Sequence, residues 1–292
     1  MPLHSWELAA CAARISVALR DNFTHLADRF TVMLETRSAS IYDYPRYYDL
    51  LFGSDWKAEF DFLRKCFDRY ALRKVKRLYE PACGTGRLLI KFAQAGYTVA
   101  GGDLNPRAVE FCNKRLSRYG FTESVRVEDM ADFAVKRPYD AAFNTINTFR
   151  HLPSEAMAVA HLKCMAQAIG VGGIYLLGLH LTPAGKPTCS QETWSARRGN
   201  LVVNSWMKSL EIDRRKRRER VAMRFDVYTL TDQFRLEDEL LFRTYSRRQI
   251  RQLLAAVPEW ECAATHDFAY DVDAPIEVDD TTEDVVFVLR RT

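Results

Sequence analysis

The chain of 292 residues has a formal net charge of +4, 48% hydrophobic residues, 12% aromatic residues and seven cysteines. This length suits one large domain, or one domain with an insertion. The charge is too small to indicate a polyanionic partner, and no stretch of about 18 apolar residues is present for a membrane span. Without a Cys-x-x-Cys pair, the scattered cysteines predict neither a zinc site nor a disulfide framework, so we expect no metal and a cytoplasmic location.

Residues 1–40 are predicted to form a helical extension of two helices. Apolar residues recur at helical spacing from Trp6 to Leu19, and again from Phe23 to Leu34. Asp21, Asn22 and Thr24 lie between the two stretches and suit helix caps. The extension either covers a pocket or packs on the outside of the domain.

A tyrosine-rich segment follows at residues 40–53 and holds Tyr42, Tyr44, Tyr47 and Tyr48. Phenol rings with polar tips suit a surface that is apolar on one side and wet on the other. The segment is therefore either a loop that anchors a helix or a lid that donates hydrogen bonds to a ligand carboxylate. The next helix has its apolar residues in one stripe, from Trp56 to Tyr70.

From residue 75 onward, short apolar runs alternate with helical stretches. The predicted strands are residues 75–79, 97–100, 124–127, 139–143 and 174–179, and the helices between them are residues 87–95, 106–119 and 152–169. Two more strands are predicted at residues 260–268 and 285–290. This alternation favours right-handed β-α-β units. We therefore predict an α/β fold with a doubly wound, mostly parallel, seven-stranded Rossmann-like sheet.

The pattern changes after Leu181, where runs with a period of two residues begin. Residues 201–207, 221–228 and 234–245 are predicted to form an antiparallel β insertion within residues 190–245. A basic tract at residues 214–218 lies between two of these strands. It is either a solvated hairpin tip or a nucleic-acid patch.

Two glycines one residue apart, Gly84 and Gly86, lie between a predicted strand and a predicted helix. Glycine is needed where the backbone takes a positive φ or approaches a ligand closely. Asp103 follows Gly84 by 19 residues, at the end of the next apolar run, where a carboxylate can accept both hydroxyls of a ribose. Leu89 stands where the third glycine of a dinucleotide fingerprint would be, which favours a nucleoside ligand without a pyrophosphate.

The stretch Glu80-Pro81-Ala82-Cys83-Gly84-Thr85-Gly86-Arg87, with Asp103 beyond it, resembles motifs I and II of the class I S-adenosylmethionine-dependent methyltransferases. This resemblance implies that residues 41–292 form a methyltransferase domain that binds S-adenosylmethionine and releases S-adenosylhomocysteine. The cofactor contacts that it implies are Tyr48, Glu80, Ala82, Cys83, Gly84, Thr85, Gly86, Arg87, Asp103, Leu104, Asn105, Asp129, Met130, Asn144 and Thr145.

More narrowly, the chain is similar to N-methyltransferases of nucleotide-linked amino sugars and glycine-like amines. The resemblance is carried by Tyr47-Tyr48-Asp49, by Phe143-Asn144-Thr145 with His151-Leu152, and by the meander at residues 194–245. It implies that His151 lies near the accepting amine, where a neutral imidazole takes up a proton. The alternative is a histidine that caps the following helix. The substrate contacts that we expect are Tyr44, Tyr47, Asn147 and Arg150.

Some features of these families are missing or altered. The chain has no Asn/Asp-Pro-Pro-Tyr motif, which argues against methylation of the exocyclic amine of adenine or cytosine, and no Pro-Cys nucleophile, which argues against methylation at C5 of a pyrimidine. Lys76 and Arg77 place charge in a strand that should be apolar, so this strand is expected to be short. We expect a small-molecule substrate, no nucleic acid, no membrane and a possible homodimer formed through an exposed sheet edge. The rival hypotheses are an RNA or protein methyltransferase and a catalytically silent cofactor-binding or partner subunit.

Overall fold

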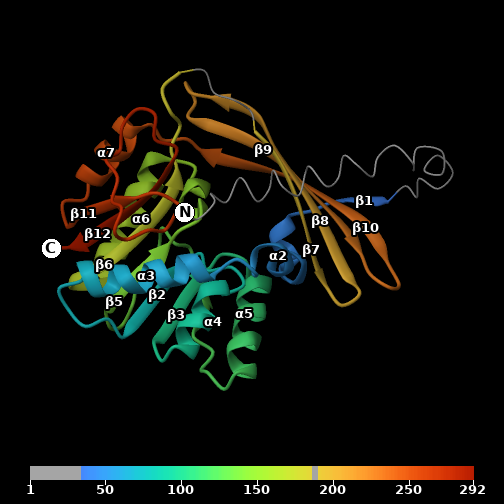
Figure 1. Cartoon of the computed structure of the whole chain (residues 1–292), viewed down its shortest axis with the longest axis horizontal. Helices are drawn as coiled ribbons and strands as arrows, with labels where there is room; N and C mark the ends of the chain where they lie inside the picture. The colour runs from blue at the N-terminus through green and yellow to red at the C-terminus, as the bar shows by residue number, and fades with distance from the viewer. Residues whose placement is uncertain (1–33, 186–189) are drawn as a thin grey trace. The chain divides into compact units, whose positions relative to one another are not determined.

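The computed structural model describes residues 34–185 and 190–292 (Figure 1). The two helices predicted near the N-terminus fall largely on residues 1–33 and lie outside the described residues. At the end of that predicted extension the structure has a strand, β1 (Glu35–Ser38), and not a helix. Residues 36–292 belong to one compact unit.

The main sheet has seven strands in the order β11-β12-β6-β5-β2-β3-β4. Their bounds are β2 (Arg77–Pro81), β3 (Thr98–Asp103), β4 (Val125–Val127), β5 (Tyr139–Asn144), β6 (Ile169–His180), β11 (Trp260–His266) and β12 (Asp284–Arg291). The four pairs from β6 to β4 are parallel, whereas β12 runs antiparallel to both of its neighbours. The prediction of a mostly parallel seven-stranded sheet is confirmed.

Helices cover both faces of this sheet (Figure 1). The helices are α3 (Lys57–Tyr70), α4 (Arg87–Gln94), α5 (Pro106–Arg118), α6 (Glu155–Ala168) and α7 (Arg247–Ala255). Buried residues of α3, α4 and α5 share one apolar cluster with the sheet, and those of α6 and α7 share another. The fold is therefore doubly wound, as the alternating sequence pattern predicts.

Strand β2 is short and begins two residues later than the sequence predicts. The backbone N–H groups of Lys76 and Arg77 donate to Oδ2 of Asp140, at 3.0 and 2.9 Å. The Arg77 guanidinium lies 5.0 Å from the centroid of the Tyr139 ring. The two charged residues thus lie at the amino end of β2. The Asp140 carboxylate accepts their backbone N–H groups, and the Tyr139 ring faces the Arg77 guanidinium.

Strand β6 begins earlier than predicted. The glycine-rich residues 170–173 were expected to end a helix, but they lie inside β6, which runs from Ile169. A Cβ on Gly173 would lie about 2.5 Å from the carbonyl oxygen of Asp140. The glycine therefore permits the close approach of two neighbouring strands. In the sequence, such a glycine looks the same as a glycine that ends a helix.

A second sheet of five strands has the order β1-β10-β9-β8-β7. Residues 190–245 supply four of them: β7 (Gln191–Arg198), β8 (Leu201–Asp213), β9 (Arg218–Tyr228) and β10 (Gln233–Arg243). The pairs among these four are antiparallel, as predicted, but the sequence predicts only three strands here. Strand β7 is mostly exposed and polar, so its sequence lacks the alternation that marks the others.

One face of the five-stranded sheet packs against the tyrosine-rich segment. This segment forms a 3-10 helix, η2 (Ile41–Asp43), and an α-helix, α2 (Pro45–Phe52). Buried side chains of β8, β9 and β10 form one apolar cluster with Ile41, Leu50 and Leu51. The insertion is therefore joined to the domain through the segment that precedes the first strand of the main sheet.

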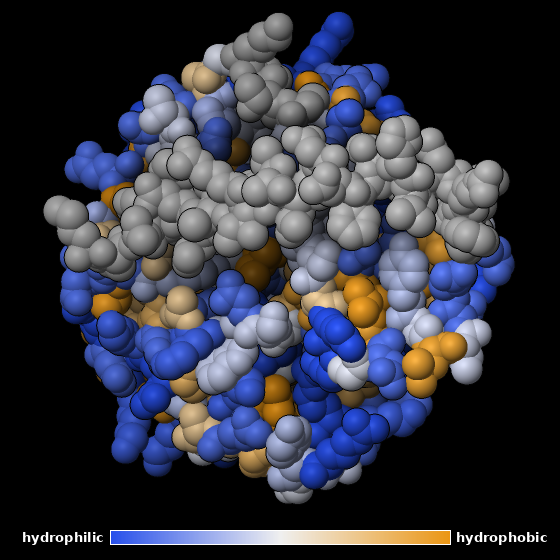
Figure 2. Space-filling view, turned by 45° about the vertical axis from the view of Figure 1, so that its right-hand side comes forward, coloured by the Kyte–Doolittle hydropathy of each residue, from blue (hydrophilic) through white to orange (hydrophobic). Residues whose placement is uncertain are grey.

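Hydrophilic residues predominate among the coloured residues on the face shown in Figure 2, and hydrophobic residues are scattered between them. Such scattering is normal for a protein surface. Within residues 34–185 and 190–292, every helix is too short or too polar to span a membrane.

Candidate functional site

The glycine turn connects β2 to α4 at the carboxyl edge of the main sheet. Gly84 and Gly86 have φ angles of 54° and 70°, in the left-handed region, and the N–H of Gly86 donates to the carbonyl of Cys83 at 2.9 Å. The two glycines differ in their surroundings. A Cβ on Gly86 would overlap the Cys112 sulfur, whereas a Cβ on Gly84 would meet nothing within 4 Å. Gly86 therefore serves packing, and Gly84 faces open space.

Replacing each glycine with alanine should separate these two roles. We expect Gly86→Ala to lower the free energy of unfolding by about 2–4 kcal/mol, because a steric overlap adds to the cost of a positive φ. Gly84→Ala should lower the free energy of unfolding by only about 1 kcal/mol, because the positive φ is unfavourable for alanine but no steric overlap is added. Urea unfolding of both variants measures the difference. Equal losses would contradict the packing role of Gly86.

Asp103 ends β3, directly beside the glycine turn. Its Oδ2 accepts the N–H of Gly84 at 2.7 Å, and its Oδ1 accepts the N–H of Asn105 at 2.8 Å. Burial raises the pKa of Asp103, although the N–H groups of Asn105 and Gly84 oppose the shift. A carboxylate offers about four acceptor positions, so these two bonds leave room for the two hydroxyls of a ribose.

Glu80, near the end of β2, carries an unpaired acceptor among the described residues. Its Oε2 is buried and has no hydrogen-bond partner in the described part of the chain. Burial raises the pKa of Glu80 well above its usual value, and the Arg87 guanidinium opposes the shift. A buried acceptor without a partner is costly, and an ammonium group bound beside the turn would supply the missing donor. The site thus fits the amino group of a bound amino-acid moiety.

Arg87 and Thr145, two of the predicted cofactor contacts, meet on one carboxylate in the structure. Arg87 forms an ion pair with Glu59, and the hydroxyl of Thr145 donates to the same side chain. Glu59 is 3% exposed and was not predicted. Its position in the sequence contains a signal, because Glu59 lies four residues before Leu63 in the apolar stripe of α3. An acidic residue within such a stripe indicates a buried partner.

The predicted adenine contacts lie beside one another at the ends of β3 and β4. The N–H of Glu128 donates to the carbonyl of Asp103 at 3.1 Å, which aligns the two segments. Asp129 Oδ1 accepts the N–H of Ala131 at 2.8 Å. Leu104 is 70% exposed, so an apolar side chain is available there for a flat ring to cover.

The tyrosine-rich segment lies close to Asp103. Asp43 Oδ1 accepts from the side-chain amide of Asn105 at 2.8 Å. Burial raises the pKa of Tyr48 to about 12; the Arg87 charge opposes this shift and the Asp103 charge adds to it. Tyr44 and Tyr47 stack on each other with centroids 6.0 Å apart, and both rings contact the insertion at Phe234. The segment therefore anchors α2 and also borders the predicted cofactor site.

His151 lies at the end of a 3-10 helix, η3 (Thr148–His151), and contacts the tyrosine-rich segment. Its Nε2 is 3.0 Å from the Tyr42 hydroxyl. Burial, with a further effect of Arg150, lowers the pKa of His151 to about 4, so the ring is neutral near pH 7. The helix-cap alternative is wrong, because the cap of α6 is Ser154, whose Oγ accepts the N–H of Met157 at 3.2 Å.

Three other predicted residues of this region bond mainly to the protein itself. Asn144 donates to the carbonyl of Pro81 at 3.0 Å, and its Oδ1 is buried without a partner among the described residues. Asn147 Oδ1 accepts the backbone N–H of His180 at 2.7 Å. Arg150 pairs with Glu219 at 2.5 Å and joins η3 to β9. Their contacts with cofactor or substrate stay predictions.

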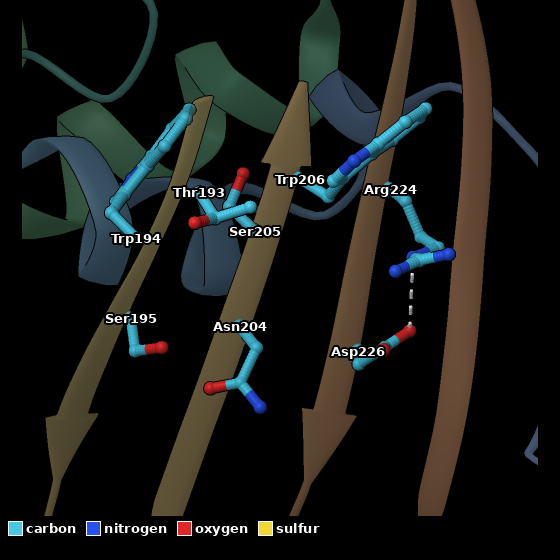
Figure 3. A pocket seen from close by; sticks show the side chains of 8 residues that line it. All are labelled: Thr193, Trp194, Ser195, Asn204, Ser205, Trp206, Arg224 and Asp226. Atoms are coloured by element: carbon cyan, nitrogen blue, oxygen red, sulfur yellow. Dashed lines mark ion pairs between the residues drawn. The ribbon is translucent and has the colours of Figure 1, made fainter. Parts of the chain in front are cut away.

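The described residues also form a hollow of about 210 Å³ on the five-stranded sheet, away from the glycine turn. Figure 3 shows its side chains along three neighbouring strands, with Arg224 paired to Asp226. The lining residues are Thr193, Trp194, Ser195, Asn204, Ser205, Trp206, Arg224 and Asp226. None of them is a predicted site residue. The described residues contain no group of three His, Cys, Asp or Glu side chains that could hold a metal.

Residues 79–173 match a family model described as a methyltransferase domain. A curated protein of Geobacillus sp. (strain WCH70), whose name assigns it provisionally to the methyltransferases, is 21% identical over 137 residues. These residues are 47% of this chain and 56% of that protein, so the chain spans little more than half the length of this relative.

Three solved structures resemble the fold over most of its length. An S-adenosylmethionine-dependent methyltransferase of Clostridium acetobutylicum is 15% identical, with a TM-score of 0.67 and coverage of 85% of this chain and 97% of that one. The sugar N-methyltransferase KedS8 of Streptoalloteichus sp. is 20% identical, with a TM-score of 0.67 and coverage of 92% and 100%. CalS10, an amino pentose methyltransferase of Micromonospora echinaspora, is 20% identical, with a TM-score of 0.65 and coverage of 88% and 99%. At these identities the likeness establishes the fold.

Proposed function

We propose that the chain is a class I S-adenosylmethionine-dependent methyltransferase that transfers the methyl group to a nitrogen atom of a small molecule, with amino sugars as the favoured class of acceptor; the methyltransferase family model and the methyltransferase structures support this. The observation that carries the proposal is the arrangement around the glycine turn. Asp103 and the partnerless acceptor of Glu80 flank the turn at the edge where the parallel strands end. Ligands of doubly wound folds bind at this edge.

Each part of the cofactor has a matching residue here. Asp103 would accept the ribose hydroxyls, and Glu80 would accept from the ammonium of the methionine part. The exposed side chain of Leu104 would cover the adenine. S-adenosylmethionine, when bound, supplies a methyl group already activated by the sulfonium, so the protein's task is to align the acceptor and exclude water.

The acceptor end of the proposed site lies between the tyrosine-rich segment and the insertion. His151 is held there by Tyr42 on one side and by the Phe242 ring, 4.7 Å away between centroids, on the other. Aromatic walls with a few polar tips suit a sugar ring that carries an amine. The sugar N-methyltransferase neighbours are consistent with this class of acceptor.

Glu80 makes cofactor affinity depend on pH in a predictable direction. Because burial raises its pKa, Glu80 becomes neutral as the pH falls, and a neutral carboxyl attracts the cofactor ammonium less. As the pH falls through the raised pKa of Glu80, we expect affinity to fall by up to about tenfold per pH unit, the limit for one linked proton. Calorimetry of wild type and Glu80→Gln tests this. Parallel pH curves for the two proteins would exclude Glu80 from the site.

The function itself is tested by calorimetry with S-adenosylmethionine, followed by incubation with a nucleoside-diphosphate-linked amino hexose, glycine, tRNA and a basic peptide. We expect a mass increase of one methyl group on the amino hexose. Labelling of tRNA or peptide alone would favour the rival enzyme classes, and cofactor binding without any product would favour a silent subunit.

The basic tract gives little support to nucleic-acid methylation. The Arg214 guanidinium donates to the carbonyls of Pro183 and Gly185, at 2.5 and 2.6 Å. Arg217 pairs with Glu155 at 2.6 Å. Lys216 also pairs with Asp213 at 3.5 Å. Three of the five basic side chains are thus engaged within the protein, which is inconsistent with a tract fully available to phosphates.

A further inference from the structure

A histidine and a carboxylate meet at the carboxyl end of β6, next to the segment that follows β5. His180 is the last residue of β6, and Asp284 is the first residue of the antiparallel neighbour β12 (Figure 1). His180 Nδ1 and Asp284 Oδ1 are 2.5 Å apart. The carboxylate therefore fixes the proton on Nδ1 and directs the lone pair of Nε2 outward.

The His180–Asp284 pair (the dyad) is accessible to solvent, and an aromatic ring lies beside it. The side chains of His180 and Asp284 are 42% and 44% exposed, and within the described residues Nε2 has no hydrogen-bond partner. The Phe268 ring lies 5.2 Å from the imidazole between centroids, and the Tyr270 ring stacks on Phe268 at 5.9 Å. A molecule can thus reach Nε2 along an aromatic surface.

Two residues with strained backbones adjoin the dyad. Asn147 and Tyr270 both have a φ of 56°, which is uncommon for asparagine and an outlier for tyrosine. Asn147 accepts the backbone N–H of His180, and Tyr270 leans on the ring that contacts the imidazole. Such strain costs about 1–3 kcal/mol per residue and concentrates at functional sites.

The dyad lies near the proposed methyl donor. In the sheet β6 lies beside β5 and β5 lies beside β2. Leu177 pairs with Asn144 at the end of β5, so His180 extends three residues further and lies roughly 14 Å from the end of β2. A Cβ on Gly178 would overlap the carbonyl of Thr145, so β6 packs closely against the Phe143-Asn144-Thr145 segment. Burial raises the pKa of Tyr270, and the charges of Glu59, Arg87 and Asp284 act on it. The Tyr270 ring also contacts Phe62 of α3, the helix that supplies Glu59, with centroids 5.5 Å apart.

The first candidate base, His151, is poorly suited to accept a proton. Its Nε2 is already engaged with the Tyr42 hydroxyl, and a pKa of about 4 makes it a weak base toward an ammonium ion. The groups that face His180 are different. They are the Asp284 carboxylate on β12, the neutral rings of Phe268 and Tyr270 after β11, and the Asn147 amide.

We propose that His180, oriented by Asp284, is the base that deprotonates the acceptor amine, while the His151–Tyr42 pair positions the acceptor. This inference rests on the proposed function. The acceptor arrives as an ammonium ion, and His180 Nε2 takes one of its protons, leaving the electron pair on nitrogen. That pair forms the bond to the methyl carbon as the carbon–sulfur bond breaks with its electrons on sulfur. The imidazolium, stabilised by Asp284, then returns the proton to water.

The test compares wild type, His180→Gln and Asp284→Asn with the amino hexose substrate over a range of pH. His180→Gln should lower kcat by about 10²- to 10⁴-fold with cofactor affinity unchanged. Asp284→Asn removes the charge that favours the imidazolium, so the acid limb of the pH profile should move to lower pH. Glu261→Gln is the matched control, because Glu261 pairs with Arg290 at the other end of β12 and should leave the kinetics unchanged.

A second readout needs no turnover. Proton–nitrogen NMR of the protein alone should show His180 as the Nδ1-protonated tautomer in wild type and as a mixture of tautomers in Asp284→Asn, whereas the His151 signals stay in place. If wild type methylates no amine, the proposed function fails. If wild type is active but His180→Gln keeps kcat within about threefold, or Asp284→Asn leaves the acid limb in place, the assignment of the base is overturned and the function stands.

Discussion

Asp103→Ala should weaken S-adenosylmethionine binding by about 2–4 kcal/mol, or roughly 30- to 800-fold in Kd, because each hydrogen bond to a charged group contributes about 1.5–3 kcal/mol. The carboxylate lies beside Gly84 with both oxygens directed at backbone N–H groups, and the two ribose hydroxyls would add to these bonds. Calorimetry with purified variants measures the loss.

Two further variants make the Asp103 result interpretable. Asp103→Asn keeps the size of the side chain and one acceptor oxygen, so it should lose less affinity than alanine. Glu110→Gln changes an exposed carboxylate of α5 that pairs with Lys114, and it should leave Kd unchanged. Because Asp103 also holds the turn, thermal unfolding must accompany each titration. A folded Asp103→Ala protein with wild-type affinity would remove this residue from the cofactor site.

Arg150→Met should lower the free energy of unfolding by about 3–5 kcal/mol, the usual cost of leaving one member of a buried ion pair without its partner. The side chains of Arg150 and Glu219 are only 6% and 15% exposed. Ser209 donates to Glu219 at 2.6 Å, and Arg150 also donates to the carbonyl of Arg243 at 3.0 Å. Urea unfolding measures the change.

The double variant Arg150→Met/Glu219→Leu separates structure from substrate binding. Replacing both charges with apolar side chains is often neutral, so we expect most of the lost stability to return. If KM for the acceptor is then close to that of wild type, Arg150 is a structural residue. A restored stability together with a KM raised at least about tenfold would support the predicted substrate contact.

The local parts of this site could be predicted from the sequence. The glycine turn depends on two residues that tolerate a positive φ, and Asp103 follows at the end of the next apolar run, so spacing alone places them together. The order of strands and helices is equally local, since each element carries its own apolar period. Predicting these features requires no knowledge of contacts between residues that are far apart in the sequence.

The other parts depend on partners far apart in the chain. Asn147 and Arg150 read as substrate contacts, but their bonds go to residues 33 and 69 positions away. The dyad joins His180 to a carboxylate 104 positions later, and no local motif marks it. Strand β7 was missed because its exposed, polar sequence lacks a buried face. In each case the three-dimensional pairing decides the role, and residue type alone does not.

The ion pair between Arg150 of η3 and Glu219 of β9 has a consequence for any exchange of the insertion between related proteins. Arg150 ties the turn that carries His151 to β9 and to the end of β10, so the geometry of this turn is inherited together with the inserted sheet. A chimera that exchanges residues 190–245 between related enzymes would have to carry Glu219, or a replacement for it, to keep the turn in place. Exchange of the insertion without Glu219 should therefore displace the turn that carries His151, whereas the bond between Asp103 and the glycine turn does not involve the insertion.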